Sequence, residues 1–139
     1  MAVDYSMPVL VVDDYRTMVR IIHNLLRQIG FSDLDGAANG RDALEKLRGR
    51  RYGLVISDWN MEQMSGYDLL QAIRADAALA ETPFIMVTTE STLEYVVAAK
   101  QAGVSNYIAK PFNAQMLKDK IESLFADTGK ATAEPLPIA

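Results

Sequence analysis

Val9-Leu10-Val11-Val12 is a run of four aliphatic residues that ends in Asp13-Asp14, and this stretch decides the fold class. Continuous aliphatic runs are typical of strands that are buried on both faces, as in a parallel sheet covered by helices. Leu54-Val55-Ile56-Ser57 repeats the pattern and ends in Asp58. The two runs therefore predict strands of one parallel sheet, each followed by carboxylates at its carboxyl end.

Strand-like and helix-like segments alternate five times along the chain. The expected strands are Val9–Val12, a segment within Phe31–Ala38, Leu54–Ser57, Phe84–Thr88 and Tyr107–Ala109. Apolar residues at helical spacing predict helices over Met18–Ile29, Ala43–Leu47, Leu69–Ile73, Val96–Ala99 and Met116–Phe125. Such alternation favours right-handed crossovers with helices on both faces of the sheet. We predict an α/β fold: a doubly wound, five-stranded parallel sheet with five helices.

The predicted ends of these helices follow from punctuating residues. Gly30, Gly49 and Gly103 each come just after an apolar stripe, where glycine commonly ends a helix. Asn113 precedes the last stripe and is expected to be its N-cap.

The chain of 139 residues is most simply one domain. We expect that domain over residues 1–126. The segment 127–139 is rich in small residues and contains two prolines, which predicts a flexible tail.

The net charge of −4 argues against binding to the nucleic-acid backbone, which needs a basic face. We interpret the basic cluster of Arg48, Arg50 and Arg51 as part of a solvent-exposed turn.

The chain has no cysteine, which excludes disulfides and thiolate metal sites and fits a reducing compartment. Its start lacks the basic and apolar regions of a signal peptide, and no stretch approaches the ~20 apolar residues that span a bilayer. We expect a cytoplasmic protein that contacts neither membrane nor nucleic acid.

The acidic strand ends carry the first functional indication. If the two strands are neighbours, Asp13, Asp14 and Asp58 crowd one rim of the sheet, where ligands bind in open α/β folds. Their charges repel, and burial raises their pKa values, unless a cation holds them. Oxygen-only ligands at a partly open site suit Mg²⁺.

Two more strand ends add to this rim. Thr88 ends the fourth expected strand and supplies a hydroxyl, and Lys110 follows the fifth and supplies an ammonium group. A carboxylate nucleophile, a metal site, a hydroxyl donor and a lysine are the parts needed to receive a phosphoryl group.

This set of residues resembles the receiver domain of two-component response regulators, from about Val9 to Phe125. Shorter matches resemble its stand-alone chemotaxis members: Asp58-Trp59-Asn60-Met61, Ile73-Arg74-Ala75-Asp76, Gln101-Ala102-Gly103 and Lys110-Pro111-Phe112. The resemblance implies the flavodoxin-like strand order 2-1-3-4-5.

The resemblance also implies roles for single residues. Asp58 would accept a phosphoryl group from a phosphohistidine of a sensor kinase, and Lys110 would pair with the phosphoryl oxygens. Thr88 would donate a hydrogen bond to the phosphoryl group, and Tyr107 would then turn inward. These movements would alter the surface of the fourth helix, fifth strand and fifth helix.

The implied cofactor is Mg²⁺. Asp14 and Asp58 would ligate it, Asp13 would help, often through water, and the backbone carbonyl of Asn60 would complete the protein's share. Trp59 would be a fluorescent reporter beside the site.

The expected protein is a monomeric signalling switch rather than an enzyme. Its partners would be a histidine kinase, a flagellar motor switch protein or another target, and a possible phosphatase. One alternative within the family is a phosphate sink or phosphorelay shuttle without motor contact. A remote alternative is an aspartyl-phosphate phosphatase of the haloacid dehalogenase type. Its Asp-x-Asp signature is not met here, because Tyr15 stands at the third position.

Three further residues stand apart from the motifs. Glu62 occupies a position where the family commonly has proline, and Thr89 replaces a small residue beside Thr88. Glu62 is expected to face solvent. His23 shares a helix face with three arginines, which predicts a solvated surface histidine.

Overall fold

The computed structural model describes residues 3–61, 64–88, 93–110 and 112–125. Its centre is a sheet of five parallel strands in the order β2-β1-β3-β4-β5. The strands are β1 (Val9–Val12), β2 (Leu34–Ala37), β3 (Leu54–Asp58), β4 (Phe84–Thr88) and β5 (Asn106–Ala109). The predicted fold class and strand order are confirmed. The predicted tail at 127–139 lies outside the described residues.

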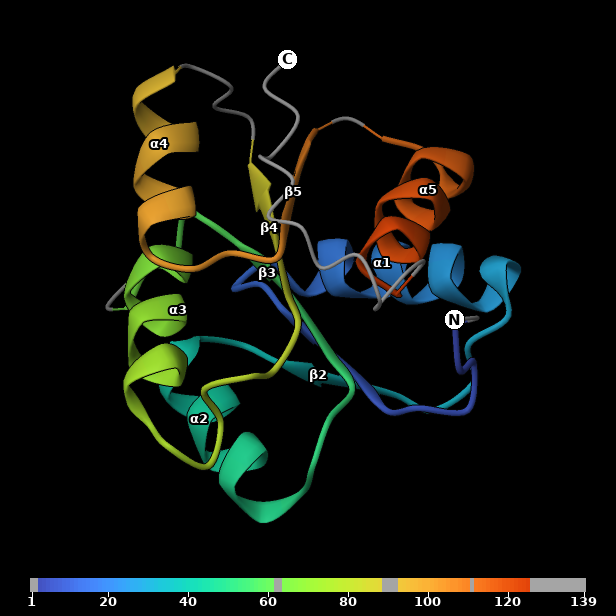
Figure 1. Ribbon diagram of the computed structural model, residues 1–139. Coiled ribbons are helices and arrows are strands. Elements are labelled where there is room, and N and C mark those ends of the chain that lie inside the picture. Colours follow the sequence, from blue (N-terminus) through green and yellow to red (C-terminus); the bar gives the residue numbers. More distant parts are fainter. Residues whose placement is uncertain (1–2, 62–63, 89–92, 111, 126–139) are drawn as a thin grey trace.

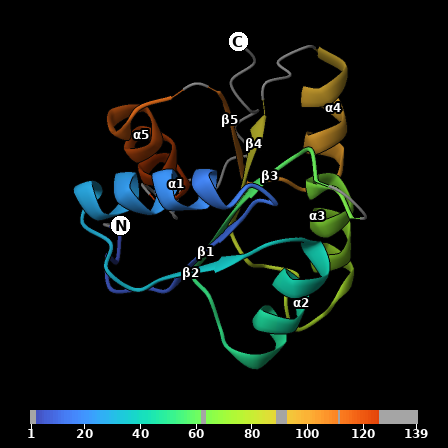
Figure 2. The ribbon, with the colours of Figure 1, turned by 180° about the vertical axis from the view of Figure 1, so that it is seen from behind.

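Five helices cover the two faces of the sheet. They are α1 (Arg16–Ile29), α2 (Gly40–Gly49), α3 (Gly66–Ala75), α4 (Leu93–Gln101) and α5 (Ala114–Phe125). Figures 1 and 2 show α1 and α5 on one face and α2, α3 and α4 on the other. The result is a three-layer arrangement with the sheet in the middle.

The alternating side chains of β1 explain why both faces need helices. Val9 and Val11 belong to the apolar cluster that includes α1 and α5 residues, whereas Leu10 and Val12 belong to the cluster on the α2 and α3 side. All four are fully buried. A strand with apolar residues in both alternating sets is stable only between two layers.

The helix ends agree with the sequence-based expectations. Gly30 follows α1 with φ 132°, a left-handed conformation that favours glycine, and its N–H donates to two carbonyls of the last turn. Asn113 accepts a hydrogen bond from the Met116 N–H at 2.8 Å, as expected of an N-cap. In the part of the chain that the structure describes, no helix is long and apolar enough to cross a membrane.

Candidate functional site

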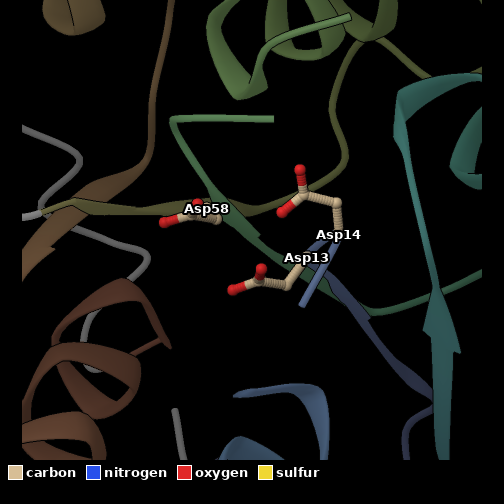
Figure 3. A group of neighbouring side chains, drawn as sticks. All are labelled: Asp13, Asp14 and Asp58. Atoms are coloured by element: carbon tan, nitrogen blue, oxygen red, sulfur yellow. The ribbon is translucent and has the colours of Figure 1, made fainter. Parts of the chain in front are cut away.

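Three carboxylates meet at the carboxyl ends of two neighbouring strands. β1 pairs with β3 so that Val12 lies opposite Ser57, which brings the next residues, Asp13 and Asp58, to the same rim. Asp13 and Asp14 follow β1, and Asp58 ends β3, as Figure 3 shows. Each residue offers one carboxylate oxygen, and these oxygens all lie within 4.8 Å of one another. The crowding expected from the sequence is therefore present.

Lys110 supplies the positive charge of the rim. Its Nζ lies 2.9 Å from Asp58 Oδ1, and the two side chains are 21% and 8% exposed. The backbone N–H of Lys110 donates to the Thr88 carbonyl at 2.8 Å, which continues the pairing of β4 with β5. An ion pair in so little solvent is strongly directional, and it holds one oxygen of Asp58 at a defined point.

The electrostatics of the rim single out Asp13. Burial, the largest cause, and the charges of Asp58 and Asp14 together raise the pKa of its carboxyl to about 6, while the hydrogen bond from the Tyr15 N–H and the charge of Lys110 act in the opposite direction. The Tyr15 N–H donates to Asp13 Oδ1 at 2.9 Å. One lysine does not offset three crowded carboxylates, so the rim favours a further cation.

The donor set suits Mg²⁺. The three carboxylate oxygens lie within 4.8 Å of one another, and Mg²⁺ is commonly bound by a few carboxylate oxygens together with waters. Asp14 is exposed, so the rim is open on one side to the waters that Mg²⁺ usually keeps. The residues therefore fit the metal that the sequence predicts.

The other predicted site residues lie around this rim. Thr88 ends β4, next to β3, and is fully buried. Tyr107 lies on β5 and is 6% exposed, so its side chain is already packed into the cluster on the α2, α3 and α4 side. Asn60 follows the rim two residues after Asp58 and is exposed. The roles predicted for these three residues stay predictions.

Gly66 packs against the end of β3 in a way that the sequence did not reveal. A Cβ on Gly66 would lie 2.1 Å from the carbonyl oxygen of Asp58, and the Gly66 N–H donates to the Trp59 carbonyl at 2.8 Å. The start of α3 thus packs directly on the backbone of the acidic rim. A glycine placed directly after the N-cap Ser65 was the available signal.

Trp59 is tied to the same helix. Its ring stacks on Tyr67 with centroids 5.6 Å apart and planes 17° from parallel. Trp59 is 9% exposed, so it is a buried aromatic beside the rim.

The prediction for His23 is wrong. Its side chain is half-buried, and Nε2 lies 2.9 Å from the Asp35 carbonyl of β2. The imidazole therefore links α1 to the sheet, a contact between residues that helical spacing alone does not reveal. Glu62 and Thr89 lie outside the described residues.

A groove of about 1000 Å³ lies at the opposite, amino ends of the strands, and Arg48, Arg50 and Arg51 line it. All three are exposed. Arg48 Nε lies 3.7 Å from Asp76, and Arg50 pairs with Asp33. The three arginines are exposed to solvent as expected, but Arg48 lies in the last turn of α2 and only Arg50 and Arg51 follow the helix.

Comparisons with known proteins agree on one family. The family model described as the response regulator receiver domain matches residues 9–122. The chemotaxis protein CheY of Pseudomonas aeruginosa is 48% identical over 119 residues, which are 86% of this chain and 96% of that protein. The chemotaxis protein CheY-3 of Vibrio cholerae is 46% identical over 120 residues, which are 86% of this chain and 92% of that protein.

Solved structures extend the likeness to the fold. The chemotaxis protein CheY4 of Vibrio cholerae superposes with a TM-score of 0.80 at 32% identity, over 86% of this chain and 98% of that one. A putative response regulator from Chloroflexus aurantiacus gives a TM-score of 0.82 at 27% identity, over 88% of this chain and 99% of that one.

Proposed function

This chain belongs to the response regulator receiver domain family, and from that premise we propose that Asp58 is the phosphoacceptor of a chemotaxis-type signalling switch. The observation that carries the assignment is the pair between Lys110 Nζ and Asp58 Oδ1 at 2.9 Å, beside the carboxylates of Asp13 and Asp14. Among the acids that the structure describes, Asp58 combines burial, a lysine partner and a place in the acidic cluster. Receiver domains of this kind are signalling switches, not classical enzymes.

The transfer needs one carboxylate oxygen of Asp58 to attack phosphorus. A bond from that oxygen to phosphorus forms as the bond from phosphorus to the donor histidine nitrogen breaks, and the histidine leaves with the electron pair. Negative charge spreads over the three other phosphoryl oxygens during this step. Lys110 is positioned to neutralise part of that charge, because its ammonium already lies against Asp58.

Asp13, Asp14 and Asp58, with the carbonyl of Asn60, would hold Mg²⁺. When bound, the ion lowers the mutual repulsion of the carboxylates and stabilises charge on the phosphoryl oxygens. Burial is the largest cause that raises the pKa of the Asp13 carboxyl, to about 6, so a nearby cation would favour its charged form.

The output would be a shift between two packings of one surface. Thr88 ends the strand next to Asp58 and would bond the phosphoryl group, and Tyr107 would change its packing in response. The affected surface, formed by α4, β5 and α5, would bind the target. We propose a flagellar motor switch protein as that target, because the relatives are chemotaxis proteins. We also propose that the protein works in the cytoplasm as a monomer.

Phosphotransfer tests the site. Wild type, Asp58→Asn and the control Asp76→Asn would be incubated with labelled histidine kinase, with and without Mg²⁺. Asp76 is an acid at the opposite end of the sheet. Wild type and Asp76→Asn should take label only with Mg²⁺, and Asp58→Asn should take none. Labelling of Asp58→Asn at the wild-type rate would show that the site assignment is wrong.

Binding tests the output separately. Purified motor switch protein would be titrated with wild type and Asp58→Asn, each with and without beryllofluoride as a phosphoryl mimic. Beryllofluoride should tighten binding of wild type and leave Asp58→Asn unchanged. A wild type that takes label but binds no motor protein in either state would remove the motor target and favour the phosphate sink.

A further inference from the structure

Arg74, in the last turn of α3, joins two loops that are distant in sequence. Its Nε donates to the Gly103 carbonyl at 2.8 Å, and Nη1 donates to the carbonyls of Ala80 and Thr82 at 3.1 and 2.6 Å. Nη2 reaches the Ser105 hydroxyl at 3.3 Å. One guanidinium therefore connects α3, the α3–β4 loop and the segment between α4 and β5.

The acceptors of Arg74 are neutral. Among the residues that the structure describes, no carboxylate lies at ion-pair distance from its guanidinium. The side chain is half-buried, and burial lowers the pKa of the guanidinium, while the charge of Glu81 opposes that shift. The planar fork of arginine can serve several acceptors at once, which a lysine ammonium cannot do in the same geometry. The arrangement thus depends on shape as well as charge.

Gly103 makes the contact with Arg74 possible. Its φ of 92° is a left-handed conformation, and a Cβ at this position would lie 3.2 Å from Arg74 Nε and 3.4 Å from Cδ. The Gly103 N–H donates to the Lys100 carbonyl, and the next N–H, of Val104, donates to the Ala99 carbonyl. Arg74 therefore binds the carbonyl directly behind the C-terminus of α4, where a positive charge is favourable.

Ser105 passes this constraint to β5. Its Oγ accepts a hydrogen bond from the Phe84 N–H at 2.9 Å, and its own N–H donates to the Phe84 carbonyl at 2.9 Å. Within the described part of the chain, β5 has four residues and pairs with β4 alone, as an edge strand of the sheet. Its far end leads into Lys110, which contacts Asp58. The start of β5 thus depends on Arg74 and Ser105, and its end carries the lysine of the acidic rim.

We propose that Arg74 is a positioning residue for phosphoryl transfer, which holds the start of β5 so that Lys110 stays aligned with Asp58. This inference rests on the proposed function of Asp58 and Lys110. A strand rises ~3.3 Å per residue, so even partial slippage or fraying of β5 is large compared with the 2.9 Å contact of Lys110. Short edge strands open locally at low cost, which makes an anchor at the start of β5 effective.

The test compares Arg74→Met and Arg74→Lys with Arg48→Met. Arg48 is the matched control, because it is also in the last turn of its helix and at the same end of the sheet, but it is 61% exposed and pairs with Asp76 instead of binding the β5 segment. Two quantities would be measured in full-length protein. The first is amide hydrogen exchange over residues 105–108, with β1 as internal reference. The second is the labelling rate of Asp58 against acetyl phosphate concentration, at saturating Mg²⁺.

Arg74→Met should speed exchange in β5 by about tenfold relative to β1. Its maximal labelling rate should fall by about tenfold, since sub-ångström misplacement of a catalytic group is costly, while the donor concentration at half-maximal rate stays unchanged. Arg74→Lys should resemble Arg74→Met, and Arg48→Met should resemble wild type. If Arg74→Met does not fold, Ser105→Ala provides the test: exchange in β5 should be about threefold faster and the maximal labelling rate about threefold lower than in wild type.

The inference is overturned if Arg74→Lys matches wild type, or if exchange in β5 rises with no change in maximal rate. The second result would leave Arg74 a purely structural role. A wild type that takes no label on Asp58 would instead contradict the proposed function. If wild type takes label normally and the Arg74 variants match it in exchange and labelling rate, the proposed role of Arg74 is wrong while the proposed function of Asp58 stands.

Discussion

Replacing Gly66 with alanine should displace β3, the strand that ends at Asp58, the proposed phosphoacceptor. The new Cβ would lie 2.1 Å from the carbonyl oxygen of Asp58 and 3.0 Å from both the Asp58 carbonyl carbon and Met86 Sδ. Real Cβ contacts essentially never fall below 3.0 Å, so α3 and β3 would have to separate by about 0.9 Å. A backbone oxygen within a paired strand cannot rotate away, which leaves movement of whole elements.

The expected cost follows from that movement. Overpacking of a well-packed interior costs about 1–3 kcal/mol, whereas alanine gains at most ~1 kcal/mol of helix propensity over glycine. We expect the overpacking to prevail at Gly66. With a urea slope of ~2 kcal/mol per M, the midpoint of unfolding should fall by about 0.5–1 M. Labelling of Asp58 should slow as well, because the shift moves its backbone.

The matched control is Gly49→Ala. Gly49 is the last residue of α2, is exposed, and has no heavy atom within 4 Å of the position of a Cβ. Urea unfolding of wild type and both variants, followed by Trp59 fluorescence and circular dichroism, gives the comparison. Gly49→Ala should be as stable as wild type or slightly more stable. A Gly66→Ala protein that is also as stable as wild type and labels normally would refute the close-packing reasoning.

Three further predictions concern the acidic rim and its aromatic neighbour. A double-mutant cycle of Lys110→Met and Asp58→Asn, measured by urea unfolding, should give a coupling of about 1–3 kcal/mol, and additive effects would contradict a stabilising pair. The raised pKa of Asp13, about 6, means that its charged form destabilises the fold above pH 6 and that this penalty disappears as pH falls towards 4. Without Mg²⁺, the free energy of unfolding of Asp13→Asn should therefore exceed that of wild type by up to ~3 kcal/mol at pH 7.5 and should equal it at pH 4. An equal gain in stability at both pH values would argue against this cause. Tyr67→Leu removes the stack on Trp59 and should shift the emission maximum of Trp59, so an unchanged spectrum would speak against the stacked geometry.

The three carboxylates of the acidic rim differ in their surroundings. Asp58 is buried, paired with Lys110 and located at the end of a strand, whereas Asp14 is exposed. Asp13 is buried, and burial is the largest cause of the raised pKa of its carboxyl. The three carboxylates thus differ in burial and in ion pairing, although each one follows or ends a buried strand. This asymmetry supports Asp58 as the residue that carries the signal.

The sequence by itself determined the architecture and the chemistry of this protein. The period of apolar residues is a local property, so Val9–Val12 and Leu54–Ser57 could be identified as buried strands, and the stripe that ends at Gly30 as a helix. Carboxylates directly after two such strands predicted an acidic rim, because carboxyl ends of parallel strands share one edge. Residue types alone then indicated a phosphoryl acceptor with a metal site.

Only the tertiary structure decided how these groups meet. The 2.9 Å contact of Lys110 with Asp58 depends on the register of β3, β4 and β5, which no local pattern encodes. The bond from His23 to the Asp35 carbonyl was missed for the same reason, since helical spacing gives a face but not what that face touches. The approach of Gly66 to Asp58 and the bonds of Arg74 depend on the paths of loops between elements. Apolar periodicity acts between residues a few positions apart, whereas distances within the site depend on packing between elements far apart in the chain.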